Sequence, residues 1–98
     1  MTRAEIQLKV IAALREIQKQ GGRDDGTVAT LDTIPIGDLP DFDSLNCEEA
    51  TVLLEAELGC ELPQNVFIAE GERRALRVRE TVDHLCQRLN IQEEGDQP

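Results

Sequence analysis

Aromatic side chains are scarce in this chain, whose 98 residues include two phenylalanines and no tryptophan or tyrosine. A core must therefore be built from Leu, Ile, Val and Ala, which is typical of a small helical bundle and disfavours an all-β fold. Long apolar runs are also missing, since no segment approaches the ~20 residues of a membrane-spanning helix. The N-terminus shows no signal-peptide pattern. These absences predict one soluble domain without membrane insertion.

Basic residues are outnumbered two to one, with 10 Lys and Arg against 20 Asp and Glu, and the formal net charge is -10. Such a charge repels nucleic acid and anionic membranes but attracts basic protein surfaces, so the expected partners are proteins. The three cysteines, Cys47, Cys60 and Cys86, contain no CxxC pair. Their number and spacing disfavour a metal site or a disulfide framework and favour the reducing cytoplasm.

The residues of nucleophilic catalysis are almost absent. The chain has one serine, Ser44, and one histidine, His84, which is expected on the last helix without an orienting partner. The glycines of a G-x-S-x-G elbow do not flank the serine. We therefore predict no catalytic residue and no enzyme activity.

Helical periodicity and capping residues predict the first two long helices. Apolar residues recur at positions 6, 10, 11, 14 and 17, between a possible cap at Thr2 and a stop at Gly21. A second helix should begin at Ser44, with Asp43 or Ser44 as its cap, and end near Gly59.

The rest of the chain completes an all-α four-helix bundle with three longer helices and one short one. We expect the short helix within residues 64–70 and the last helix over residues 75–89. A long loop over residues 23–42 joins the first two long helices. Residues 1–90 form the predicted domain, and residues 91–98 a disordered tail.

A helical wheel at ~100° per residue divides the second helix into two faces. The inward face is predicted to contain Cys47, Ala50, Leu54 and Leu58. The outward face carries an apolar strip rimmed by carboxylates, which suits a basic and partly hydrophobic protein partner. Its members are Leu45, Val52 and Ala56 with Glu48, Glu49 and Glu55.

The tripeptide "DSL" ahead of this acidic helix resembles the attachment motif of acyl carrier proteins. The resemblance extends to "CELP", which matches the family's "E-[IL]-P" segment at the family's spacing from Ser44, and to "LRVRETVDHLCQRL", which is similar to its last helix. The family usually has a glycine where this chain has Asp41, and the segment containing "GERRA" is longer. The resemblance covers nearly the whole domain and favours a specialised rather than a housekeeping member.

The resemblance implies a carrier of acyl thioesters in fatty-acid, polyketide or related lipid biosynthesis. Ser44 would bear a covalent 4'-phosphopantetheine arm derived from coenzyme A, Asp43 would contact the phosphopantetheinyl transferase or its metal, and Leu45 would be a docking contact. Acyl-loading and acyl-processing enzymes with basic surfaces would recognise the outward face of the second helix. The carrier would be a cytoplasmic monomer.

Two alternatives remain. The chain resembles aminoacyl and peptidyl carriers less, because their "GG-x-S" is missing. In the other alternative it is an acidic helical interaction module without a prosthetic group, in which Ser44 is only a helix cap.

Overall fold

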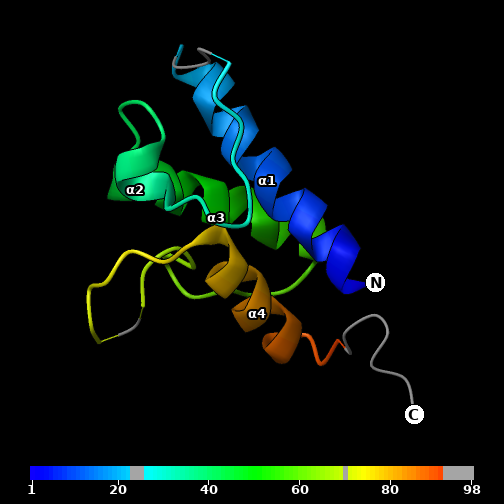
Figure 1. Cartoon of the computed structure of the whole chain (residues 1–98). Helices are drawn as coiled ribbons and strands as arrows, with labels where there is room; N and C mark the ends of the chain where they lie inside the picture. The colour runs from blue at the N-terminus through cyan, green and yellow to red at the C-terminus, as the bar shows by residue number, and fades with distance from the viewer. Residues whose placement is uncertain (23–25, 70, 92–98) are drawn as a thin grey trace.

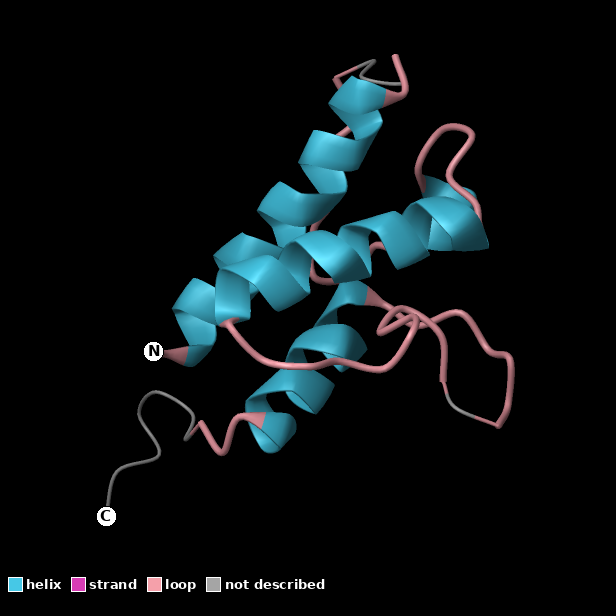
Figure 2. Cartoon of the chain, turned by 180° about the vertical axis from the view of Figure 1, so that it is seen from behind, coloured by secondary structure: helices cyan, strands magenta, loops and turns pink. Residues whose placement is uncertain are grey.

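The computed structural model describes residues 1–22, 26–69 and 71–91. Over these residues the chain is a compact, mostly helical domain with four helices and no strands (Figure 1). The helices are α1 (Arg3–Gln20), α2 (Pro35–Asp38), α3 (Ser44–Leu58) and α4 (Val78–Arg88). Helix α1 packs against both α3 and α4, and α2 packs against α3. The reverse view shows α1 and α3 crossing, with α4 reached through a long connection (Figure 2).

Helix α1 has the boundaries that its sequence predicts. The backbone N–H of Glu5 donates to the Thr2 hydroxyl at 3.2 Å, and the Glu5 carboxylate accepts from the Thr2 backbone at 3.0 Å. This reciprocal pair is a capping box, which satisfies two backbone donors at the helix start. The hydrogen bond from the Thr2 backbone also lowers the pKa of Glu5. At the other end, Gly21 is the C-cap.

The core is mainly aliphatic, as the composition predicts, although both phenylalanines are buried in it, and it gathers around the inner faces of α1, α3 and α4. Its buried members include Ile6, Val10, Leu14, Ile17, Cys47, Ala50, Leu54, Phe67, Val78, Val82 and Leu85. The predicted inward face of the second helix is therefore largely correct, although Leu58 is only half-buried. Two threonines, Thr51 and Thr81, are also buried, at 2% and 0% exposure.

The loop between α1 and α3 differs from the prediction because it contains the short helix, α2. Pro35 occupies the first turn of α2, where its missing N–H costs nothing. Gly37 has φ 106°, outside helical values, so α2 is little more than one turn. The same loop fixes the start of α4, because the backbone N–H of Val78 donates to Thr33 O at 2.8 Å and that of Arg79 to Leu31 O at 2.9 Å. Helix α4 therefore begins three residues later than the predicted residue 75.

The prediction of a short helix within residues 64–70 is wrong for the described residues 64–69, which form turns, while Glu70 lies outside the described residues. Side chains from two helices form hydrogen bonds with the backbone of this segment. Val66 N donates to the Thr51 hydroxyl at 3.2 Å, and the Thr81 hydroxyl donates to Val66 O at 2.9 Å. In a helix over this segment, the C=O of Val66 would instead accept the backbone N–H of the residue four positions later. Farther on, Ile68 and Ala75 form one antiparallel bridge.

The predicted tail begins at Ile91, which is half-buried and donates its backbone N–H to Cys86 O at 2.8 Å. Residues 92–98 lie outside the described residues. None of the helices in the described ranges has the length and apolar character needed to cross a membrane.

Candidate functional site

Ser44 is the first residue of α3, and its neighbour Asp43 is the helix cap. The Asp43 carboxylate accepts from Asn46 N at 3.0 Å, and the Asn46 amide oxygen accepts from Asp43 N at 3.0 Å. Asn46 is buried, with 5% exposure, whereas Ser44 is exposed. The structure thus decides between the two predicted caps in favour of Asp43. The Ser44 hydroxyl therefore lies outside the capping hydrogen bonds.

The backbone at Ser44 is tied to the connection between α3 and α4. The Asn65 side-chain amide donates to Ser44 O at 3.1 Å, and its oxygen accepts from Phe67 N at 3.0 Å. Phe67 is fully buried. The serine is therefore held at a fixed place by a buried anchor, while its side chain faces solvent.

A groove of about 640 Å³ lies beside Ser44. Helix α3 forms one side, and the connection to α4 forms the other. The lining residues are Ser44, Glu48, Pro63, Gln64, Asn65, Ile68, Ala69, Gly71 and Arg73. Arg73 has φ 54°, in the left-handed region that few residues other than glycine adopt. The groove thus combines a hydroxyl, a guanidinium, two side-chain amides and the carboxylate of Glu48.

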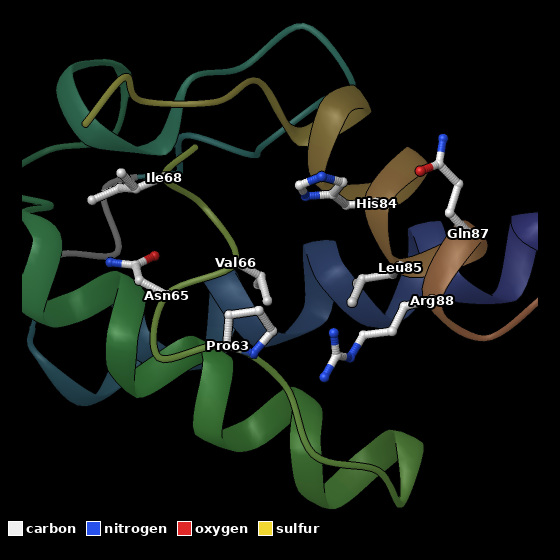
Figure 3. Close-up of a pocket in the computed structure, with 8 residues that line it drawn as sticks. All are labelled: Pro63, Asn65, Val66, Ile68, His84, Leu85, Gln87 and Arg88. Atoms are coloured by element: carbon white, nitrogen blue, oxygen red, sulfur yellow. The ribbon is translucent and has the colours of Figure 1, made fainter. Parts of the chain in front are cut away.

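A second pocket, of about 360 Å³, lies between the connection and α4 (Figure 3). It is lined by Pro63, Asn65, Val66, Ile68, His84, Leu85, Gln87 and Arg88. Three of these residues, Pro63, Asn65 and Ile68, also line the groove beside Ser44. The two depressions are therefore neighbours on the two sides of the same short segment.

The predicted apolar strip of α3 is exposed. Leu45 and Val52 are 63% and 62% exposed, and Ala56 is also exposed. Apolar side chains with such exposure stabilise the fold little, so they remain available for contact with another protein.

The three carboxylates predicted beside this strip differ in their engagement. Glu55 is half-buried and accepts from Leu62 N at 2.9 Å, so it holds the chain that leaves α3. Glu48 accepts from the Gln64 amide at 3.1 Å, and Glu49, which is exposed, accepts from the Asn46 amide at 3.3 Å. Glu55 thus has a structural role that the helical wheel did not predict.

Two other reactive side chains in the described part of the chain, Cys47 and His84, lie outside the groove beside Ser44. Burial, together with the nearby Asp43 charge, raises the pKa of the Cys47 thiol to about 12, which leaves it a poor nucleophile. His84 is exposed on α4 and lines the second pocket rather than the groove beside Ser44. Within the described part of the chain, no group of three or more His, Cys, Asp or Glu side chains is arranged to hold a metal ion.

Two residues near Ser44 were missed by the sequence analysis, namely Asn65 and Arg73. They belong to the connection, whose path depends on contacts with both helices. The "PQN" after the second helix and the "GERR" turn were the available signals, but neither indicates which way the segment folds back. Comparison of the chain with protein-family models, curated proteins and solved structures gives no match.

Proposed function

We propose that the protein is an acyl carrier, not an enzyme, and that Ser44 bears its 4'-phosphopantetheine arm. The observation that carries the proposal is the position of Ser44: an exposed hydroxyl on the first residue of α3, with the capping role taken by Asp43. A carrier needs to present a hydroxyl without activating it, because the transferase supplies the base and the metal. An exposed serine at a rigid helix start meets that requirement.

The surroundings of Ser44 fit the arm chemically. The first backbone N–H groups of a helix lack partners within the helix, and the positive end of the helix dipole favours a phosphodiester anion. Arg73 adds a guanidinium to the adjoining groove, and the side chains of Gln64 and Asn65 add amides. These residues would hold the arm along the groove. The bound arm supplies a terminal thiol on which an acyl group is held as a thioester.

Partner enzymes would dock on the exposed face of α3. Leu45, Val52 and Ala56 offer apolar contact, and Glu49 offers an exposed charge for a basic partner surface. Carboxylates around an apolar strip steer a basic partner and fix its orientation. Asp43, next to the serine, is placed to contact the transferase while it caps the helix.

Modification of the purified chain tests the proposal directly. The unmodified protein is incubated with a broad-specificity phosphopantetheinyl transferase, coenzyme A and Mg²⁺, and its intact mass is measured. In this reaction the Ser44 oxygen bonds to phosphorus, the bond to adenosine 3',5'-bisphosphate breaks, and the hydroxyl proton passes to the transferase base. We expect one added arm on the wild type and none on Ser44→Ala.

Ser44 is the only serine of the chain, so the variant is an unambiguous control. An unmodified wild type, tested beside a known carrier that the same transferase modifies, would refute the carrier proposal. That result would favour an acidic interaction module without a prosthetic group.

A further inference from the structure

We propose that the pocket between residues 63–68 and α4 binds a short aliphatic carboxylate. If the chain is the acyl carrier proposed above, this site receives the free carboxylate of a dicarboxylic acyl cargo. This assignment of the cargo rests on the proposed function, whereas carboxylate binding by the pocket does not.

The charge of the pocket differs from that of the whole chain. The chain carries a formal charge of -10, yet the described residues that line this pocket include Arg88 and His84 and no carboxylate. Arg88 donates its Nε–H to Glu61 O at 3.0 Å, which fixes the guanidinium and leaves its two terminal nitrogens for a ligand. A planar guanidinium binds a carboxylate through two parallel hydrogen bonds, the strongest class of such contacts.

The shape of the pocket suits an aliphatic chain behind that charge. His84, Leu85 and Arg88 project from α4 toward the segment 63–68, whereas the amide of Gln87 points away (Figure 3). Val66 and Leu85 form buried apolar walls, with 5% and 1% exposure. The volume of about 360 Å³ lies at the lower end of the range for small-molecule pockets. A ligand with a few methylene groups and one anionic end matches both features.

The position of the pocket connects it with Ser44. Pro63, Asn65 and Ile68 line this pocket and also the groove beside the serine. A flexible arm attached at Ser44 would therefore pass along the groove and over this short segment before its cargo reached the pocket. A cargo with a second carboxylate would place that charge near Arg88 and His84, whereas a plain alkyl cargo would bring no anion to the Arg88 guanidinium.

The pocket is tested first on the unmodified protein, by titrating hexanoate and, separately, hexanamide while following the backbone amide signals by NMR. We expect hexanoate to shift the signals of Val66, His84 and Leu85 and to bind about tenfold more tightly than hexanamide, the difference of a charge-assisted hydrogen bond. Arg88→Gln should reduce the affinity for hexanoate to that for hexanamide, and His84→Gln should reduce it less. Lys19→Gln removes the same charge from the exposed end of α1 and should change nothing.

Carboxylate binding in this pocket would be refuted by equal affinity for the two ligands or by signal shifts confined to other residues. Equal losses of hexanoate affinity in Arg88→Gln and Lys19→Gln would refute it as well. Circular dichroism of each variant shows whether the helices are retained. If Arg88→Gln loses helicity, His84→Gln decides, since an exposed side chain on α4 can be replaced without removing a core contact.

The cargo statement is tested on protein loaded at Ser44 with adipoyl or hexanoyl arms, which have equal carbon chains. We expect the adipoyl form alone to shift the signals of His84 and Leu85. If intact mass shows that Ser44 takes no arm, the proposed function and the cargo statement fall together, and the hexanoate titration still decides the pocket. If both arms attach and give the same signals, the cargo statement alone is wrong.

Discussion

Replacing the cap of α3 separates the roles of two adjacent residues. Asp43→Ala removes the carboxylate that accepts the Asn46 N–H at 3.0 Å, while the reverse bond, from the Asp43 backbone to the Asn46 side chain, can persist. Ser44→Ala removes an exposed hydroxyl that takes no part in this capping box. The first change should destabilise the domain, and the second should not.

The expected magnitude follows from the geometry of the cap. Loss of an Asp cap costs about 0.5–2 kcal/mol, and for a domain of this size 1 kcal/mol corresponds to a shift in Tm of roughly 4–8 °C. An exposed substitution without such a contact stays within about 0.5 kcal/mol. Asp43→Asn keeps an acceptor oxygen at the same position, so it should retain most of the stability.

Urea denaturation followed by circular dichroism at 222 nm measures all three variants against the wild type. The slope of the transition should not change, because the same surface is exposed on unfolding. If Ser44→Ala lowers the unfolding free energy as much as Asp43→Ala does, the serine contributes to the cap of α3, and the assignment of the cap to Asp43 alone is wrong. The same result would remove the main support for Ser44 as a free attachment site.

Four further perturbations are predicted together, namely three substitutions and one chemical labelling. Val52→Asp should leave the helices intact and speed dissociation of the transferase in a kinetic binding assay. Glu55→Lys should in addition lower the stability of the domain, because the Glu55 carboxylate accepts a backbone N–H of the chain leaving α3. A backbone N–H at the start of α4 donates to the Glu80 carboxylate and lowers its pKa. The stabilisation by the ionised carboxylate is present above the unfolded pKa and is lost as pH falls through the folded pKa. The stability difference between wild type and Glu80→Gln should therefore shrink from pH 7 to about pH 3. A thiol reagent at pH 8 should label the half-buried Cys60 in the native protein and the buried Cys47 only after unfolding.

Each of these has a contrary outcome. Helicity lost in Val52→Asp would show that this side chain packs in the fold. A stability difference for Glu80→Gln that is constant with pH would mean that the carboxylate does not contribute through its charge. Native labelling of Cys47 at the rate of Cys60 would show that α3 opens readily.

The first and third helices could be predicted from sequence because their signals are local. The apolar residues on every turn lie within α1, and the Thr2 cap and the Gly21 stop lie directly beside it. The beginning of α3 at Ser44 was predicted correctly, but the cap was left open because Asp43 and Ser44 are both good cap residues. What decides between them is the reciprocal hydrogen bonding with Asn46, whose side chain is buried in the folded domain.

The short helix was predicted in the wrong connection because its absence from residues 64–69 depends on distant side chains. Thr51 and Thr81 lie 30 residues apart in sequence and reach Val66 from opposite sides. The candidate site divides in the same way. Exposure of Ser44 and of Val52 follows from the wheel of one helix, whereas the nearness of Asn65 to Ser44 follows from the path of the whole connection.

The two buried threonines have a consequence for protein engineering. Because the N–H and C=O of Val66 are satisfied by hydroxyls from different helices, neither helix can be exchanged alone. A chimera that takes α3 from another protein with valine in place of Thr51 would fill the same space yet leave a buried N–H without an acceptor. The transplantable unit is therefore α3, the segment through Phe67 and α4 together, and a library that randomises this chain should keep a hydroxyl at both threonine positions.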